Sequence, residues 1–342
     1  MRSTAYLLSL AFPALAASSL ALEGAWTLLT PALIFGLVPL LETLTGAPST
    51  APPGGIESAR TEPRWMRALL WLHGILHLGL LGWGAAHAAR GDWTLLEWIG
   101  RSLSLGTEVG AVMFVVAHEL GHRPRPADRR LARVLLASAF YPQFGLEHDR
   151  GHHRYVGTPS DPVTARRGEG LWAFLARAIP GCTADGFRTG RTQAERRRRS
   201  ILGPGNPFLA DLAVAVALLA TITWLLGPAA AGAWLAASAF GVFLLESVEY
   251  IQHYGLERRQ LEDGSFERVA ARHSWNSNHP IGRALLIELP RHADHHAHAA
   301  RPYGGLRSLE GAPQLPLGYP GSILMATVPP LWKRVMDPRI PA

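Results

Sequence analysis

The chain has 342 residues, 48% of them hydrophobic, and a formal net charge of +7. Its single cysteine, Cys182, excludes a disulfide framework and any built-in iron or zinc module with Cys-x-x-Cys ligands. Electrons for a redox reaction would therefore have to come from another protein. The basic charge does not indicate a nucleic-acid partner, because arginines gathered on one face are typical of membrane proteins.

Six long apolar stretches separate the polar parts of the chain. About 20 helical residues cross a hydrocarbon core of about 30 Å, and each stretch is long enough to do so. They predict an all-α fold: a polytopic integral membrane protein with one domain over residues 1–342. The expected spans are residues 6–22, 25–44, 66–89, 93–117, 208–226 and 229–251.

The first apolar stretch has two interpretations. Arg2 ahead of it and the small residues Ala14–Ala17 within it imitate a secretory signal peptide. A second apolar stretch follows almost at once, however, and this favours an uncleaved first span.

The arginines orient the spans. If the N-terminus is cytoplasmic, the connection 45–65, the segment 118–207 and the tail 252–342 all lie inside. Of the 33 basic residues, only Arg90 and Arg101 then fall on the outer side, as the positive-inside rule requires. We therefore expect both termini to lie in the cytoplasm.

Two features of the segment 118–207 bear on this inner face. Residues 128–141 are amphipathic and predict a helix that lies along the inner surface. The basic run Arg196–Arg199 has two compatible interpretations, an anchor for anionic lipid headgroups and a docking site for an acidic electron carrier.

For several histidine, acidic and small residues inside the spans, a structural role is the first interpretation, ahead of metal or substrate binding. His73 and His77 lie four residues apart on the third span, which favours hydrogen bonds between helices over metal binding. Glu108 is a candidate for a similar pairing within the bundle. Small residues on the fourth span either line an interior channel or allow close helix packing; these are Gly106, Gly110 and Ala111.

Three histidine clusters are the strongest functional signal. The first holds His118 and His122, the second His148, His152 and His153, and the third His292, His295 and His296. Neutral imidazole is a common ligand for iron, zinc, copper and nickel. Two histidines four residues apart on a helix share one face and can reach one ion.

These eight histidines are too many for one ion and predict a dinuclear site. The spacing of the second cluster pairs His148 with His152 and directs His153 elsewhere, toward a second ion. The charge-based topology brings all three clusters to the same membrane face. It also places His253 there, at the inner end of the sixth span, as a ninth ligand candidate.

Metal-bound imidazoles usually donate their second N–H to a carboxylate or a carbonyl. Six acidic residues near the clusters are candidates for this supporting role, and His273 is a seventh candidate. The acidic residues are Glu119, Glu147, Asp149, Asp161, Glu249 and Asp294.

Two other classes of protein fit part of this pattern. His118-Glu119-x-x-His122 matches the motif of zinc proteases. Membrane-embedded zinc proteases also need an intramembrane Asp as third ligand, but the candidate Asp263-Gly264 lies in a polar stretch. Most of the histidines would also have no role in a protease. A transporter or a metal store should carry its histidines at several depths, whereas these lie at one face.

The clusters occur together with further motifs, among them Thr158-Pro159-Ser160-Asp161-Pro162 and His253-Tyr254-Gly255-Leu256. In this order and spacing they resemble the membrane-bound non-haem di-iron family of desaturases and hydroxylases. The finer sequence is similar to the bacterial alkane 1-monooxygenases over roughly residues 60–310. Two departures are Glu249-Tyr250-Ile251-Gln252, where the family commonly has Asn-Tyr-x-Glu, and Pro290, where it tends to have Gln.

The resemblance implies a bacterial inner-membrane enzyme that uses O2 to convert medium- or long-chain alkanes to 1-alkanols, without haem or flavin. It implies electrons from a rubredoxin or ferredoxin-like carrier and its NAD(P)H reductase. Methyl hydroxylation of alkyl-aromatics, as in xylene monooxygenases, and fatty acyl desaturation are the alternatives. The family holds two irons with nine histidines, which match His118, His122, His148, His152, His153, His253, His292, His295 and His296.

Overall fold

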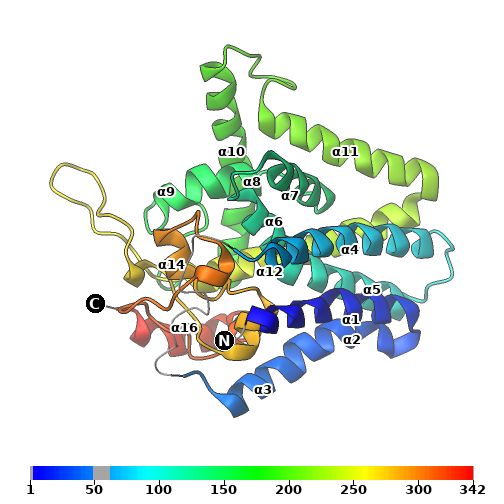
Figure 1. The fold of residues 1–342 in the computed structure, drawn as a ribbon, viewed down its shortest axis with the longest axis horizontal. Coiled ribbons are helices and arrows are strands. Elements are labelled where there is room, and N and C mark those ends of the chain that lie inside the picture. The colour runs from blue at the N-terminus through cyan, green and yellow to red at the C-terminus, as the bar shows by residue number, and fades with distance from the viewer. Residues whose placement is uncertain (1–2, 49–61, 342) are drawn as a thin grey trace.

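The computed structural model describes residues 3–48 and 62–341, so most of the connection 45–65 lies outside the described residues. The described chain is helical, and in place of strands it has only the isolated bridges Gln260–Phe266 and Asn276–Gln314. The prediction of an all-α fold is confirmed. Figure 1 shows the long helices alongside one another, with most of the short C-terminal elements gathered toward one end.

Six helical runs of the described chain are long and apolar enough to cross a membrane, as predicted. They cover Ser3–Ala21, Gly24–Thr45, Arg64–Ala88, Leu95–Gly121, Pro207–Leu226 and Pro228–His253. The predicted bounds differ from these by a few residues. The fourth run continues past residue 117, so the first histidine cluster begins on its last turn.

The spans are built, in chain order, from η1 (Ser3–Leu10) and α1 (Ala11–Ala21); η2 (Gly24–Leu28), α2 (Leu29–Ala32), η3 (Leu33–Leu37) and α3 (Val38–Thr45); α4 (Arg64–Ala88); α5 (Leu95–Glu108), η4 (Val109–Met113) and α6 (Phe114–Gly121); α11 (Pro207–Leu226); and α12 (Pro228–His253). The other elements are α7 (Pro126–Ser138), α8 (Phe144–Glu147), η5 (His148–His152), α9 (His153–Tyr155), α10 (Leu171–Arg196), η6 (Ala271–His273), α13 (Pro280–Leu285), α14 (His292–Ala297), η7 (Tyr303–Gly305), α15 (Tyr319–Ala326), α16 (Pro329–Met336) and η8 (Asp337–Arg339). Among all the elements named, η3 and η4 in the spans and η5 outside them are π-helical turns.

Local sequence explains where several spans begin and end. α5 starts at a capping box, in which Thr94 and Glu97 satisfy each other's backbone N–H groups. Between α11 and α12 the chain turns at Gly227, whose φ of 85° favours glycine, and Pro228 then opens α12.

Small residues bring α12 close to the fourth span. A Cβ atom added to Gly106 would lie 2.7 Å from the carbonyl oxygen of Ala237, and one added to Gly110 would lie 2.5 Å from Cβ of Leu244. Glycine at such contacts lets two membrane helices approach closely. Close packing is therefore the role of Gly106, and Gly110 combines it with a place in an apolar cavity.

Buried hydrogen bonds join four helices in the middle of the bundle. The imidazole of His77 on α4 contacts Glu108 on α5 at 2.7 Å and the hydroxyl of Ser138 on α7 at 3.0 Å. The carbonyl of Ser138 accepts a hydrogen bond from the indole of Trp234 on α12. His73 similarly contacts Ser9 at 2.8 Å. Both histidines thus connect helices, as predicted.

The amphipathic helix expected at residues 128–141 forms as α7, and its expected position along the inner membrane surface stays a prediction. One face of α7 is buried, whereas Arg129, Arg130 and Arg133 are exposed. The helix turns back from the end of α6 and packs against α6, α4 and α11. Its last residue, Ser138, reaches the middle of α4. Its apolar face and its C-terminal polar groups thus find buried partners between the spans.

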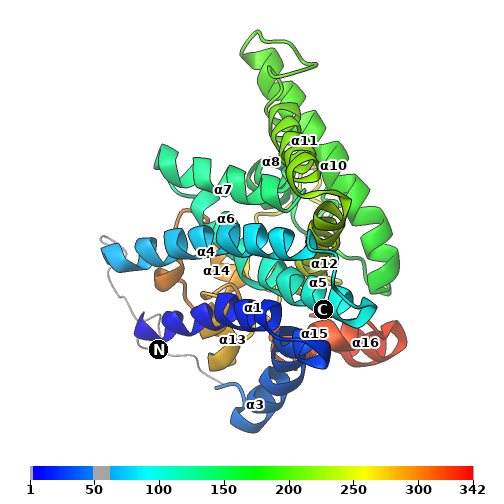
Figure 2. The same cartoon turned by 90° about the vertical axis from the view of Figure 1, so that its right-hand side faces the viewer.

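One long helix of the segment 118–207, α10, was not predicted. In two perpendicular views, α10 and α11 project away from the other helices (Figures 1 and 2). Small residues at intervals of four allow one face of α10 to pack closely: Ala178, Cys182, Gly186, Gly190 and Ala194 are all buried. The basic run that starts at Arg196 therefore follows the outer end of this helix.

We predict that Gly110→Leu destabilises the protein. The new side chain would overlap α12, and overpacking of this kind costs about 1–3 kcal/mol or more. The matched control is Gly79→Leu on α4, where an added Cβ meets no other atom within 4 Å. Thermal unfolding in detergent should show a lower Tm for Gly110→Leu alone, and equal Tm values for both variants would contradict this account of the packing.

Candidate metal centre

The nine candidate histidines come together at one end of the helix bundle. His118 lies on the last turn of α6, and His253 is the last residue of α12. The second cluster occupies η5 and the start of α9, and the third occupies α14. Most of these imidazoles are buried.

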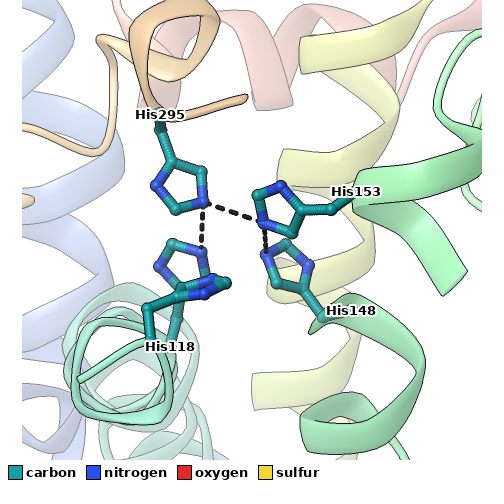
Figure 3. A group of neighbouring side chains, drawn as sticks. His118, His148, His153 and His295 are labelled. Atoms are coloured by element: carbon teal, nitrogen blue, oxygen red, sulfur yellow. Dashed lines mark hydrogen bonds between the residues drawn. The ribbon is translucent and has the colours of Figure 1, made fainter. Parts of the chain in front are cut away.

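Five of the histidines form one group, in which all ligand nitrogens lie within 4.8 Å of one another. The Nε2 atom of His295 is 2.9 Å from that of His118 and 3.1 Å from that of His153. His148 approaches His153 at 3.1 Å, again through the Nε2 atoms. Figure 3 shows these four side chains pointing at one another from three separate parts of the chain. His122 is the fifth member.

The other four histidines form a second group: His152, His253, His292 and His296. Their Nε2 atoms also face one another. His292 lies 3.0 Å from His253 and 2.9 Å from His296, and His296 lies 3.2 Å from His152.

The π-helical turn η5 decides how the second cluster is divided. Because residues five apart align in a π-helix, His148 joins His153 in the group of five, and His152 joins the group of four. His148 and His152 also form a further group that could hold an ion, together with Glu249, so the expected pairing of these two histidines at one ion stays a prediction. In the third cluster the α-helical rule holds, since His292 and His296, four residues apart, share a group.

This donor set fits metal ions. Metal–imidazole bonds are about 2.0–2.1 Å long for zinc, so two such bonds at a right angle place their nitrogens about 3 Å apart. The Nε2–Nε2 distances of 2.9–3.2 Å match that value. Facing lone pairs of neutral imidazoles repel one another, and a cation between them turns this repulsion into attraction. The acceptor chemistry of imidazole suits iron.

Electrostatics keeps most of these ligands neutral. Burial and the neighbouring imidazoles hold the pKa values of five of them well below the ordinary value: His148, His153, His292, His295 and His296. Burial also opposes the charged form of His152, but the carboxylates of Asp161, Glu249 and Glu246 together outweigh it and raise the pKa of this imidazole. Neutral imidazole is the form that binds a metal.

Two groups lie within hydrogen-bond distance of imidazoles in the way expected of metal ligands, and a third lies farther away. A carboxylate oxygen of Asp161 lies 3.0 Å from Nδ1 of His152. The backbone carbonyl of His273, rather than its side chain, lies 3.3 Å from Nδ1 of His253. Asp149 is more exposed and approaches Nδ1 of His122 at 3.7 Å.

Glu249 lies between the two groups. Its carboxylate is 3.8 Å from Nδ1 of His148, 3.7 Å from Nε2 of His152 and 3.9 Å from Nε2 of His253. One of its oxygens, Oε2, has no hydrogen-bond partner among the described residues although it is buried. A buried carboxylate oxygen without a donor is itself a fit for a nearby cation.

Two of the expected supporting carboxylates bind elsewhere. Glu119 accepts hydrogen bonds from the guanidinium of Arg123 and the backbone N–H of Tyr303. Asp294 is bound by Arg301 and His298. Glu147 is buried, and its Oε1 has no partner within the described residues. Glu119 and Asp294 thus hold together the protein around the histidines. Sequence proximity alone does not distinguish this role from contact with an imidazole.

A narrow apolar cavity leads from the histidines into the bundle. Near the site it is lined by His118, His148 and His292 together with Phe114 and Leu245. It adjoins a second apolar cavity between the spans, and both share Gly110, Val248 and Leu289. The second cavity reaches half-exposed residues of the spans, among them Phe35 and Ala111. Apolar space thus lies both beside the histidines and next to half-exposed residues of the spans.

Comparison with known proteins agrees with this arrangement. The family model described as "Fatty acid desaturase" matches residues 92–321. The alkane 1-monooxygenase of Ectopseudomonas oleovorans is 38% identical over 90% of this chain and 76% of its own. Alkane 1-monooxygenase 2 of Pseudomonas aeruginosa is 38% identical over 93% of this chain and 85% of its own.

A more distant relative is the hydroxylase component of the xylene/toluene monooxygenase of Pseudomonas putida. It is 30% identical over 69% of this chain and 63% of its own. The residues that the family model matches, 92–321, include all three histidine clusters of this chain. The chain therefore belongs to the fatty acid desaturase family.

Proposed function

We propose that this protein is an alkane 1-monooxygenase, which hydroxylates the terminal methyl group of medium- or long-chain alkanes. In this reaction one O2, two electrons and two protons convert R–CH3 into R–CH2OH and one H2O. The observation that carries the proposal is the apolar cavity that ends at His118, His148 and His292. The alkane 1-monooxygenases among its relatives support the same reaction.

We propose two iron ions as the cofactor, one held by the group of five histidines and one by the group of four. Bound iron would supply the activation of O2 that an unreactive C–H bond requires. Asp161 and the carbonyl of His273 fix the orientation of His152 and His253. Glu249 approaches both groups and would balance part of the positive charge of ions bound there.

The cavity residues position the substrate and exclude water. A linear hydrocarbon enters such a narrow passage end-on, so that its leading methyl group alone reaches the histidines. Phe114, Leu245 and Leu289 offer no hydrogen-bonding side chain to water, so their part of the cavity excludes it, whereas Glu249 and Gln252 are the polar residues that line the cavity besides the histidines.

The electrons require a partner. Cys182 is buried and alone, so the chain carries no cysteine-ligated redox centre of its own. We propose a rubredoxin or ferredoxin-like carrier with an NAD(P)H reductase. We further propose that the protein lies in the bacterial inner membrane with the histidine end and both termini in the cytoplasm, because the arginines cluster on that side.

Three alternative activities remain to be compared with this proposal. The relative in xylene/toluene oxidation favours a methyl group on an aromatic ring, although its identity and coverage are lower. The family name favours desaturation of a fatty acyl chain. A zinc protease is disfavoured, because its general base would be Glu119, which is engaged by Arg123 and by the backbone of Tyr303.

Metal analysis tests the proposed centre. We expect about two irons and little zinc per chain, and His253→Ala should leave about one iron because the group of four loses a ligand. The control is His298→Ala, which lies beside the third cluster but outside both groups. A single zinc per chain, or native iron content in His253→Ala, would contradict the proposed site.

Product analysis tests the reaction. Cells that carry the protein together with an electron-donor system should convert octane or hexadecane mainly to the 1-alkanol, because end-on entry presents the terminal carbon even though internal C–H bonds are weaker. Gas chromatography distinguishes the outcomes. Internal alcohols or alkenes would move the protein to another branch of the family, and a strong preference for p-xylene would favour the alkyl-aromatic alternative.

A substitution in the outer cavity tests the substrate path. Ala111 lines only the cavity farther from the histidines, so Ala111→Leu should shorten the longest alkane that is accepted while leaving the shorter ones as substrates. The control is Ala217→Leu on the exposed side of α11. An unchanged chain-length profile in Ala111→Leu would show that the tail of the substrate lies elsewhere.

A further inference from the structure

A third cavity, much larger than the two apolar ones, lies behind the group of four histidines. Its volume is about 930 Å³, and it is formed by the segments 157–166 and 255–273 together with Arg177 and Pro341. Five arginines line it, and we refer to it as the arginine pocket: Arg166, Arg177, Arg258, Arg259 and Arg272.

The wall of the arginine pocket contacts two members of the group of four directly. Asp161 lines the pocket and lies 3.0 Å from Nδ1 of His152. His273 also lines it, and its carbonyl lies 3.3 Å from Nδ1 of His253. A group bound in this pocket would thus lie one residue away from two ligand imidazoles. Asp161 would separate it from His152, and His273 would separate it from His253. The apolar cavity reaches other histidines of the site, His118, His148 and His292, and it shares no lining residue with the arginine pocket.

The pocket carries an excess of positive charge. Arg177 and Arg272 are paired with Glu169 and Glu267, respectively. The guanidinium of Arg258 donates instead to backbone carbonyls, at 2.6 Å to Glu267 and 2.9 Å to Arg154, so these contacts leave its charge uncompensated.

The rim adds to this excess. Arg166 and Arg259 are exposed there, and the acidic residue at the rim is Glu257. Three more exposed arginines lie close to them in sequence, Arg154, Arg167 and Arg268, against two more exposed acidic residues, Glu262 and Asp263, so the balance stays positive. Such a surface attracts an acidic partner and speeds its association.

The other candidate for this role, the run Arg196–Arg199, lies far from the histidines. It follows the outer end of α10, which Figure 1 shows projecting away from α14 and the other helices. An electron carrier bound there would have no short connection to either histidine group. This position suits the alternative interpretation, an anchor for anionic lipid headgroups.

We propose that the arginine pocket is the docking site of the acidic electron carrier and that electrons enter through the group of four histidines. This inference rests on the proposed function, which requires an external donor. Each reduced carrier is oxidised by one electron at this site, so that two docking events supply the two electrons consumed with each O2. The protons come from solvent.

The experiment measures carrier binding rather than product. Full-length protein in nanodiscs is titrated with reduced rubredoxin as the acidic probe, at low and at high salt. The pocket variant combines Arg166→Glu with Arg259→Glu, both of which replace exposed side chains. The control combines Arg197→Glu with Arg199→Glu beyond α10, so that both variants carry the same change in net charge. A basic cytochrome of similar size serves as a probe of opposite charge.

The pocket variant should raise the Kd for rubredoxin by about tenfold or more at low salt and weaken its salt dependence, because paired charges are screened over about 8–10 Å. The control should keep the native Kd, and iron content should be native in both. The neutral pair Arg166→Gln and Arg259→Gln should give an intermediate Kd, which separates lost charge from a damaged fold.

Two results would overturn the proposal: a native Kd in the pocket variant, or a larger loss in the control beyond α10. Failure of the proposed function has a different signature. Rubredoxin would then bind through the pocket and become oxidised, yet no 1-alkanol would form from octane in the presence of O2.

Discussion

Mutual repulsion among buried imidazoles is the constraint on which the rest of the molecule depends. Nine histidines bring their nitrogens together at one end of the bundle, with several Nε2–Nε2 distances near 3 Å. Each neutral imidazole has one N–H and one lone pair, so hydrogen bonds among them satisfy only some of these nitrogens, whereas a bound cation would attract every lone pair that faces it. The metal ions that we propose there would connect α6, η5, α12 and α14, which are separate in sequence.

The surrounding protein holds these ligands in place without touching the metal positions. Glu119 joins the first cluster to the backbone of Tyr303, and Asp294 joins the third cluster to Arg301. Just before α14 the chain passes through Ile287 and Glu288, both with positive φ, a conformation that costs energy in residues other than glycine. The Glu288 carboxylate is fixed by Arg283 and by the hydroxyl of Tyr6, so buried hydrogen bonds offset this strain and present His292 to the site.

The two cavities divide the tasks that the proposed reaction imposes. A hydrocarbon is most soluble in the bilayer, and an apolar passage from Phe35 and Ala111 toward His118 suits its entry. A protein carrier is confined to water, and the arginine pocket offers it a charged surface beside His152 and His253. Because the two cavities share no lining residue, substrate and electrons can approach the histidines without competing for space.

The sequence by itself determined the helical class, the six spans and the nine histidines that meet at one end. Hydropathy over about 20 residues and the spacing of four on a helix are local properties, and they survive folding unchanged. The pairing of His148 with His153 could not be predicted in this way, because it depends on one π-helical turn, a shift of hydrogen-bond register that leaves no periodic signal. The position of α7, with Ser138 against His77, and the packing of Gly110 against Leu244 depend on contacts between residues far apart in sequence. The arginine pocket was likewise decided only by the tertiary structure. Charge counts place arginines on one membrane face, but only folding brings Arg166 and Arg259 together behind two of the nine histidines.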